Sequence, residues 1–222
     1  MIVLENLTKA FHLRGQRKVV ADNINATFPS GTSVALLGRN GAGKSSLLKM
    51  IAGTMSPTSG RIVSDGTLSW PVGFAGSFHG ELTGAQNTRF VARIYGIDSD
   101  ELIDFVEDFA ELGGHYRLPF RTYSAGMKSR LAFGVSMGIA FDTYLVDEVT
   151  SVGDAAFREK SVKVFNERMK TAGAIVVSHA MGLVREMCDV GAVLEGGRLI
   201  YYEDLDEAIA HHEANMKQGK AG

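Results

Sequence analysis

The sequence predicts an α/β protein in which a helical segment is inserted into a parallel sheet. Short apolar segments typical of strands occur in the first third of the chain and again from Tyr144 onward, where helical segments separate them. Between these two regions, residues 84–141 have helical periodicity. With 222 residues, the chain is long enough to bury a core without disulfides or metal ions.

The composition excludes several classes of protein. Lysine and arginine number 23 against 25 acidic residues, and this balance argues against a surface for nucleic acid or anionic lipid. The single cysteine, Cys188, excludes a disulfide framework and is typical of a buried structural thiol in a reducing compartment. No apolar run approaches 18 residues, and the amino-terminal MIVLENLTKAF has acidic and polar residues where a signal peptide needs an apolar core. We therefore expect neither a membrane span nor a signal peptide.

The first third of the chain predicts strand, glycine-rich turn and helix. Apolar and polar residues alternate in Val20–Phe28, which is typical of a strand with one buried face, and Pro29–Gly31 end it. Ser33–Leu37 is almost continuously apolar, as in a parallel strand covered on both faces. A helix is expected over Lys44–Ala52, with Gly53 closing it in a left-handed cap.

The middle of the chain predicts three helices. Thr83 and Gln86 have the spacing of a capping box for a helix that runs to Tyr95 and stops at Gly96. A second helix is expected over Asp98–Leu112, because apolar residues recur there at steps of three and four.

Gly113 should end that second helix, and a third helical stretch should run from after Ser124 to about Phe141. An acidic helix is expected from Leu205, after a hairpin turn. The remaining predicted strands are Tyr144–Asp147, Ala174–Ser178 and Gly191–Glu195.

A glycine-rich segment carries the clearest chemical signal. Residues 38–45, GRNGAGKS, fit the pattern G-x-x-x-x-G-K-[ST] and lie between a predicted strand and a predicted helix. The backbone N–H groups of such a loop hold phosphate oxygens, Lys44 reaches the β and γ phosphates, and Ser45 offers an oxygen to Mg²⁺. A chance match in a chain with 26 glycines is the alternative, which the strand-turn-helix context disfavours. The expected nucleotide-binding residues are Gly38, Arg39, Asn40, Gly41, Ala42, Gly43, Lys44, Ser45 and Ser46.

Two carboxylates follow an apolar strand. We expect Asp147 to hold Mg²⁺, directly or through water, and Glu148 to orient or deprotonate the attacking water. The alternative is a strand that merely meets solvent at its acidic end. Beside a phosphate-binding loop we favour the first interpretation, because a hydrolytic site still lacks a metal ligand and a base.

A third motif lies at the start of the helix after Ser124. A serine hydroxyl, a small residue and a helix amino terminus can form an anion site, and the alternative is an ordinary helix start with Ser124 as N-cap. Here the sequence resembles the ATP-binding subunits of ABC transporters, whose signature LSGGQ occupies this place. Ser124 and Gly126 match the signature, whereas Tyr123, Ala125 and Met127 differ.

The resemblance covers almost the whole chain and implies a fold. It implies a P-loop NTPase core, the ABC-type nucleotide-binding domain, with an amino-terminal antiparallel β subdomain and an inserted helical subdomain. Residues 1–222 would then form a single ATP-binding domain, with the helical subdomain at 84–141.

The resemblance also implies roles for further residues. Phe11 would stack on adenine, although a lone phenylalanine is more often part of a core. Ser151–Asp154 corresponds to the D-loop, which touches the partner subunit, and Asp154 is counted among the nucleotide-binding residues. His179 matches the switch histidine that contacts the γ phosphate, and its alternative role is structural. We expect the other histidines, which show no metal-ligand spacing, to be surface or loop residues: His12, His79, His115, His211 and His212.

One residue of the family is missing. Family members have a glutamine on the loop after the early strands, where it senses Mg²⁺ and contacts the membrane subunit. Leu68–Gly84 contains no glutamine, and Ser77, His79 or a water are the candidates to replace it. In the same region, Trp70, Phe74 and Phe78 are candidates for the interface with the membrane subunit, and core packing is their alternative role.

Five segments narrow the resemblance to a subfamily. SWPVGF, SFHGELTG, RFVARIYG, YSAGMKSRLAFG and DEVTSVGDAAFREK look like the ATP-binding subunits of bacterial capsular polysaccharide exporters, and exporters of O-antigen and teichoic acid share part of this pattern. The resemblance implies a homodimer that clamps ATP and Mg²⁺. It also implies integral membrane permease subunits and envelope accessory proteins as partners, no nucleic acid, and a peripheral position at the cytoplasmic face of the inner membrane.

Other classes of protein fit less well. Soluble ABC ATPases that act in translation or on DNA usually have two ATP-binding halves or a long coiled coil, and this chain has neither. A GTPase switch would need an N-K-x-D segment to recognise guanine, which the sequence lacks. A purely structural or binding module would have no use for Glu148 beside Asp147.

Overall fold

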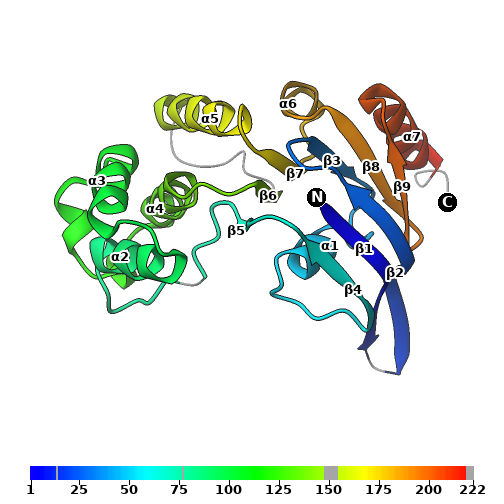
Figure 1. Ribbon diagram of the computed structural model, residues 1–222, viewed down its shortest axis with the longest axis horizontal. Coiled ribbons are helices and arrows are strands. Elements are labelled where there is room, and N and C mark those ends of the chain that lie inside the picture. Colours follow the sequence, from blue (N-terminus) through cyan, green and yellow to red (C-terminus); the bar gives the residue numbers. More distant parts are fainter. Residues whose placement is uncertain (14, 77, 148–154, 219–222) are drawn as a thin grey trace. The chain divides into compact units, whose positions relative to one another are not determined.

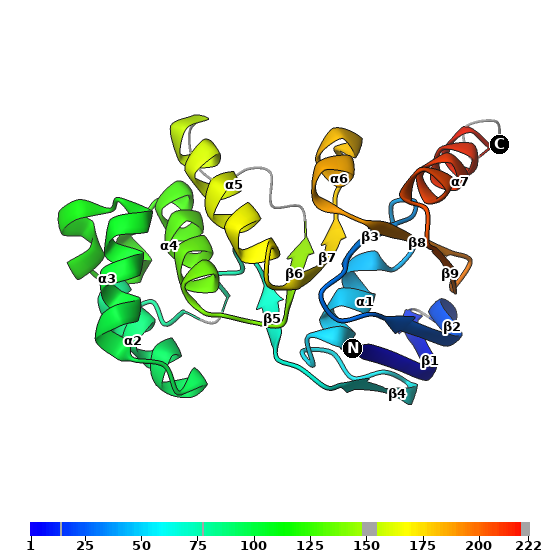
Figure 2. The same cartoon turned by 45° about the horizontal axis from the view of Figure 1, so that its top comes forward.

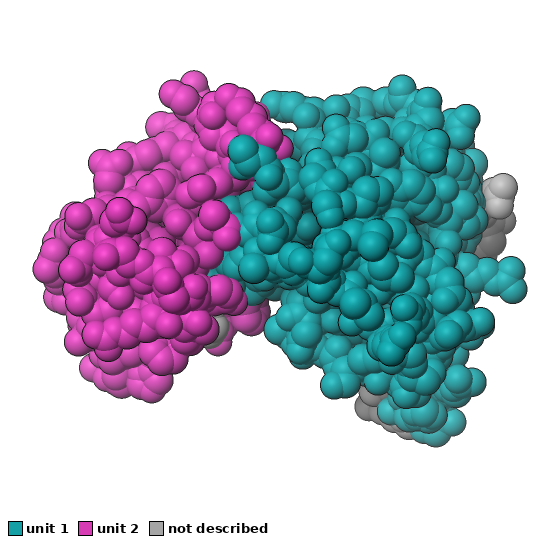
Figure 3. Space-filling model, viewed as in Figure 1, with its two compact units in different colours: residues 1–71, 141–148, 171–222 teal, residues 72–140, 149–170 magenta. Residues whose placement is uncertain are grey.

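The computed structural model describes residues 1–13, 15–76, 78–147 and 155–218 (Figure 1). These residues form two compact units, which Figure 3 shows in two colours. Unit 1 contains the described residues of 1–71, 141–148 and 171–222, and unit 2 contains those of 72–140 and 149–170. The strands given below all belong to unit 1, whereas unit 2 is built from helices.

The amino-terminal part of unit 1 is an antiparallel sheet of three strands in the order β2-β1-β4. The strands are β1 (Ile2–Leu13), β2 (Gln16–Phe28) and β4 (Ser59–Ser64). The predicted alternation is confirmed from Asn23 to Phe28, because Ile24 and Phe28 are buried while the polar residues between them are exposed. The antiparallel sheet implied by the family resemblance is also confirmed.

The second sheet of unit 1 has six strands in the order β5-β6-β7-β3-β8-β9. All neighbouring pairs are parallel except the last, in which β9 returns antiparallel to β8. Every residue of β3 is buried, as its continuous apolar sequence predicts. The strands are β3 (Ser33–Leu37), β5 (Leu68–Pro71), β6 (Thr143–Asp147), β7 (Gly173–Val177), β8 (Val190–Glu195) and β9 (Arg198–Tyr202).

Three helices pack on these sheets (Figure 2). Helix α1 (Lys44–Ile51) contributes its apolar side to a core that also contains residues of both sheets. It ends at Ile51, one residue before the predicted Ala52, and Gly53 has the predicted left-handed conformation with a φ of 70°. Helices α6 (Met181–Met187) and α7 (Leu205–Gln218) complete the unit, and α7 lies against β8. A Cβ on Gly191 would stand 2.2 Å from that of Ala208, so only glycine permits this close packing.

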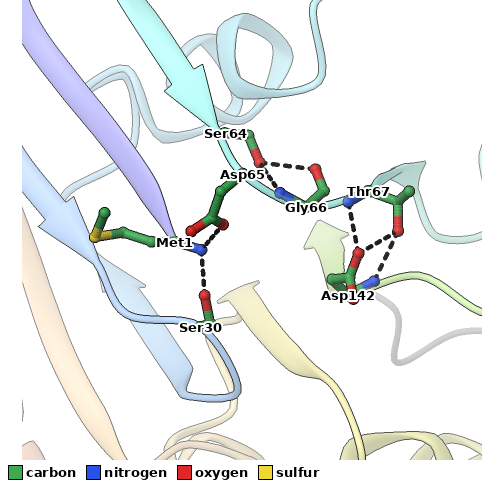
Figure 4. Close-up of polar contacts among 7 residues, drawn as sticks. All are labelled: Met1, Ser30, Ser64, Asp65, Gly66, Thr67 and Asp142. Atoms are coloured by element: carbon green, nitrogen blue, oxygen red, sulfur yellow. Dashed lines mark hydrogen bonds and ion pairs between the residues drawn. The ribbon is translucent and has the colours of Figure 1, made fainter.

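Polar contacts tie the strand connections together in unit 1 (Figure 4). The carboxylate of Asp142 accepts hydrogen bonds from both N–H and Oγ1 of Thr67, each at 2.7 Å, and so links the starts of β5 and β6. These hydrogen bonds, first of all that from the backbone N–H of Thr67, lower the pKa of Asp142. Nearby, the amino group of Met1 contacts Ser30 Oγ and the carboxylate of Asp65.

Unit 2 contains the predicted helices with corrected ends. Thr83 and Gln86 form the predicted capping box, and Gly96 ends that helix with a φ of 66°. The second helix ends at Ala110 rather than Leu112, because Glu111 takes the left-handed conformation. Gly113 therefore does not end it but begins a short 3₁₀ helix. The elements are α2 (Gly84–Tyr95), α3 (Ser99–Ala110), η1 (Gly113–Arg117), η2 (Phe120–Thr122), α4 (Ala125–Gly138) and α5 (Ala155–Met169).

Aromatic rings hold the helices of unit 2 together. Phe109 of α3 stacks on Phe133 of α4 at 5.7 Å and meets Phe157 of α5 edge-on at 5.2 Å. The guanidinium of Arg130 lies 4.5 Å from the centroid of the Phe157 ring. The predicted end of the third helix near Phe141 is wrong, because Ile139 is already extended and α4 ends at Gly138.

Candidate nucleotide-binding site

Three adjacent parallel strands deliver the predicted catalytic groups to one edge of the sheet. The P-loop (residues 38–45) follows β3, Asp147 ends β6, and His179 follows β7, which lies between the other two. Neighbouring strands lie about 4.8 Å apart, so the ends of β3 and β6 are about 10 Å apart. That spacing leaves room for a phosphate group and a metal ion between the loop and the carboxylate.

The backbone of the P-loop needs glycine at two places. Gly38 has a φ of 151°, and a Cβ there would lie 2.5 Å from the carbonyl oxygen of Leu194. Gly43, the N-cap of α1, has a φ of 113°, and a Cβ there would lie 2.8 Å from Cβ of Val20. The loop is therefore fitted closely between β8 and β2, and it leads into the start of α1, where the first backbone N–H groups of a helix lack partners within the helix.

Lys44 is 8% exposed and its ammonium group is held by the loop itself. Its Nζ donates a 2.7 Å hydrogen bond to the carbonyl oxygen of Gly38 and a 3.2 Å hydrogen bond to that of Arg39. These contacts keep the charge at the mouth of the loop, where the sequence predicts phosphate binding.

One pocket of about 460 Å³ in unit 1 collects most of the predicted site residues. The P-loop side contributes Asn40, Gly41, Gly43, Lys44, Ser45 and Ser46. Phe11, Asp147 and His179 line the same pocket. Residues far apart in the sequence thus line one space, as expected if the P-loop binds phosphates, Asp147 holds a metal ion and His179 contacts the γ phosphate.

The remaining P-loop residues face a different space. Gly38, Arg39 and Ala42 line a second pocket of about 400 Å³, together with the turn after β8 and with His212 and Asn215 of α7. The predicted contact of these three residues with nucleotide stays a prediction.

Phe11 stands on β1 at the rim of the first pocket and is half-buried. Lys9 Nζ lies 5.1 Å from the centroid of the Phe11 ring and donates a 2.7 Å hydrogen bond to the carbonyl oxygen of Ser56. The lysine therefore fixes the ring from one side, and the ring can present its other face to a planar base.

Asp147 and His179 are positioned by their neighbours. Asp147 is paired in register with Val177 of β7, which also lines the pocket. After β7, the buried Ser178 accepts a 3.1 Å hydrogen bond from the backbone N–H of Ala180, and this turn presents the exposed His179 at the pocket. Glu148 and the segment Ser151–Asp154 lie outside the described residues.

Two residues of β2, Lys18 and Val20, line the pocket but are not among the predicted site residues. Pairing with Phe11 could have identified Lys18, because the two residues are direct cross-strand partners and therefore lie on the same face of the sheet. The register is continuous from this pair to Leu13 and Gln16, and the three register shifts between β1 and β2 lie between Leu4 and Ala10.

The expectation that all remaining histidines are surface or loop residues is wrong for His212. It belongs to α7, is 8% exposed, and follows the buried Ala208 and Ile209 at helical spacing. Burial lowers the pKa of His212, and the positive charge of Lys44 lowers it further. His211, in the same helix, contacts Tyr202 Oη at 2.8 Å through its Nδ1.

The signature residues lie in unit 2, at the exposed start of α4. Ser124 is the N-cap, and its Oγ accepts a 3.2 Å hydrogen bond from the backbone N–H of Met127. Gly126 is exposed, and a Cβ on it would meet only Ser124 Oγ, at 4.0 Å. Ser124 thus caps the helix, as expected of an ordinary helix start. The open space at Gly126 also leaves room for an external anion, as the anion-site interpretation requires.

The segment that lacks the family glutamine is also described, apart from Ser77. His79 Nδ1 accepts a hydrogen bond from the backbone N–H of Glu81 at 3.3 Å. Phe74 is 51% exposed, whereas Phe78 packs edge-on against Phe120 at 5.3 Å. Trp70, in unit 1, packs in the same way against Phe141 at 5.6 Å. Of the three aromatic candidates, Phe74 is thus the one that is clearly exposed.

Within the described ranges, no helix combines the length and apolarity that crossing a membrane would require.

Comparison with known proteins agrees with this site. The ABC transporter family profile matches residues 21–151. The polysialic acid transport ATP-binding protein KpsT of Escherichia coli is 50% identical over 96% of each chain. The capsule polysaccharide export ATP-binding protein CtrD of Neisseria meningitidis is 41% identical over 96% of this chain and 99% of its own.

Among solved structures, the fold is similar to that of the ATP-binding cassette MJ0796, described as a dimer in a post-hydrolysis state bound to ADP and Pi. The TM-score is 0.77 with 20% identity, over 92% of this chain and 99% of the other. Fold, motif order and sequence identity agree, and the chain belongs to the ABC transporter family.

Proposed function

We propose that this chain is the ATP-hydrolysing subunit of an ABC transporter that exports a capsular polysaccharide across the bacterial inner membrane. The observation that carries the proposal is the pocket of unit 1, in which the P-loop, Asp147, His179 and Phe11 line one space. The relatives named for polysialic acid transport and for capsule polysaccharide export match over nearly their whole length, which supports the choice of cargo class.

ATP would bind with its base on Phe11 and its phosphates in the P-loop. Backbone N–H groups at the start of α1 would point at the phosphates. Lys44 contacts the Gly38 and Arg39 carbonyls and would exchange these contacts for the β and γ phosphates. Asn40 and Ser46 line the same space and would contact the phosphate chain.

The residues present also fit a magnesium ion. Ser45 and Asp147 line the same pocket and offer a hydroxyl and a carboxylate oxygen, which are hard ligands of the kind that Mg²⁺ prefers. Mg²⁺ supplies neutralisation of the phosphate charge when it is bound together with ATP. Two protein ligands suffice, because magnesium in such sites keeps waters and phosphate oxygens as its other ligands.

Hydrolysis would need a base and a group that senses the γ phosphate. Glu148 follows Asp147 directly and is the proposed base that orients the attacking water. His179, held at the pocket by the turn after β7, would donate a hydrogen bond to the γ phosphate.

Two copies of the chain would close the site together. The exposed start of α4, with Ser124 and Gly126, would cover the γ phosphate of ATP bound to the partner chain, and Asp154 would lie at the same junction. The γ phosphate then holds the two copies together, and its removal separates them. This alternation would drive a membrane partner between two conformations.

The remaining assignments follow from this role. The partners would be integral membrane permease subunits, with envelope accessory proteins beyond them, and the chain would sit peripherally on the cytoplasmic face of the inner membrane. The exposed Phe74 is the proposed contact with a permease. We further propose that residues 1–222 function as a single ATP-binding domain, in which 84–141 act as the helical subdomain.

Substitution Glu148→Gln tests the clamp. The variant should lose phosphate release yet form an ATP-dependent dimer, measured by light scattering after gel filtration. Adding Lys44→Ala to it should abolish the dimer, because the phosphates are no longer held. A Glu148→Gln variant that stays monomeric at saturating ATP would contradict the proposal.

Purification from membranes tests the transport role. The tagged chain should bring down an integral permease, identified by mass spectrometry, and Phe74→Ser should weaken this capture without changing ATP binding. Recovery of an O-antigen or teichoic acid permease would change the cargo class. Recovery of ribosomes or DNA in place of a permease would refute the transporter assignment.

A further inference from the structure

We propose that Lys18 of β2 is a second phosphate-binding cation of the nucleotide pocket, which holds the phosphate chain of the bound nucleotide from the side opposite to α1. This inference rests on the proposed function, because it names a further residue of the same site.

Two contacts show that β2 runs along the P-loop. A Cβ on Gly43 would lie 2.8 Å from Cβ of Val20, and a Cβ on Gly41 would lie 3.7 Å from Nζ of Lys18. Lys18 and Val20, which are two residues apart on the strand, thus face Gly41 and Gly43, which are two residues apart on the loop. Because side chains two apart in a strand project from the same face, Lys18 and Val20 both point toward the loop, and both line the pocket.

The position of Lys18 suits the phosphates rather than the base. Its direct cross-strand partner is Phe11, the proposed support of the base, so both residues project from one face of the sheet. The ammonium group extends past that position to Gly41, where the backbone of a P-loop cradles the phosphates.

Lys18 is also available for a ligand. It is exposed, and among the residues that the structure describes its Nζ has neither an ion pair nor a hydrogen-bond partner. Lys44, in contrast, must first leave the carbonyl oxygens of Gly38 and Arg39. Lys18 can therefore attract a polyphosphate without breaking contacts within the protein, and its contribution should depend on ionic strength.

The test compares the affinities of ATP, ADP and adenosine for Lys18→Gln, measured by isothermal titration calorimetry on the full chain. The worth of an exposed ion pair predicts that ATP and ADP bind about fivefold more weakly, whereas adenosine binding changes less than twofold. Raising the salt concentration should shrink the difference for ATP.

The neighbouring residue supplies the matched control. Arg17 is also exposed and basic, but it pairs with His12 and projects from the other face of β2, so Arg17→Gln should leave ATP affinity unchanged. Lys18→Arg should restore most of the ATP affinity, because it restores the cation.

Three outcomes would overturn the inference: unchanged ATP affinity in Lys18→Gln, equal weakening of adenosine and ATP, or equal weakening by Arg17→Gln. Failure of the unsubstituted chain to bind ATP at all is a separate result, which would refute the proposed function and this inference with it.

Discussion

Substitution of Gly43 by alanine should destabilise the fold more than the same change at Gly53 or Gly182. Gly43 has a φ of 113°, where an L side chain costs about 1–2 kcal/mol. Its new Cβ would also lie 2.8 Å from Cβ and 3.0 Å from the carbonyl oxygen of Val20, neither of which is the flexible end of a side chain. Such overpacking costs about 1–3 kcal/mol more. The expected loss in the free energy of unfolding is therefore about 2–5 kcal/mol.

Two control variants separate these contributions. Gly53 has a φ of 70° with nothing within 4 Å, so Gly53→Ala should lose only the conformational part, about 1–2 kcal/mol. Gly182 is in α6 and has neither a positive φ nor a close neighbour. Gly182→Ala should therefore stabilise the chain by up to about 1 kcal/mol.

Thermal unfolding followed by circular dichroism can measure this order. For a chain of this size, 1 kcal/mol shifts the melting temperature by about 2–4 °C, so Gly43→Ala should melt at least several degrees below the parent. Isothermal titration with ATP should show weaker binding in Gly43→Ala, because β2 would push the loop aside. The reasoning is refuted if Gly43→Ala is as stable as Gly53→Ala.

Three further substitutions or treatments have defined outcomes. Ser124→Arg should block hydrolysis but leave ATP binding to the isolated chain intact by calorimetry, and a loss of binding would place Ser124 in its own chain's pocket. Asp142→Asn should lower the free energy of unfolding in urea at pH 7. Because hydrogen bonds lower the pKa of Asp142, its stabilisation is complete above the ordinary value of 3.8 and is lost as pH falls through the lowered one, so the effect should vanish in strong acid. A constant difference across pH would contradict this cause. Burial raises the pKa of Cys188 to about 12, so iodoacetamide at pH 8 should label it rapidly only in urea, and rapid labelling of the folded chain would disprove its burial.

Local signals in the sequence predict much of this fold. The capping box of Thr83 and Gln86 forms within four consecutive residues, so no distant contact decides it. The cap at Gly53 is local in the same way. The P-loop carries its own strand, turn and helix signals, and its surroundings agree with them because a parallel sheet places the ends of β3, β6 and β7 at one edge.

Tertiary contacts explain the features that the sequence does not predict. Glu111 takes a left-handed conformation although glycine would be the usual choice, so α3 ends two residues before the predicted Leu112. His212 is buried because α7 packs on the sheet, which no local pattern announces for a histidine. Lys18 lines the pocket because β2 pairs with β1 and so places Lys18 across from Phe11, a contact between two strands.

The hydrogen bonds between Lys44 and the P-loop carbonyls affect how readily the site releases a bound nucleotide. In the proposed binding mode, Lys44 would give up its two carbonyl oxygens when a nucleotide enters and would regain them when the product departs. The hydrogen bonds that Lys44 loses offset part of the free energy of its contact with the phosphates, and this lowers the net affinity for ADP. An ATPase that must release ADP in every cycle benefits from this competition between the loop carbonyls and the phosphates, because tighter binding of ADP would slow turnover.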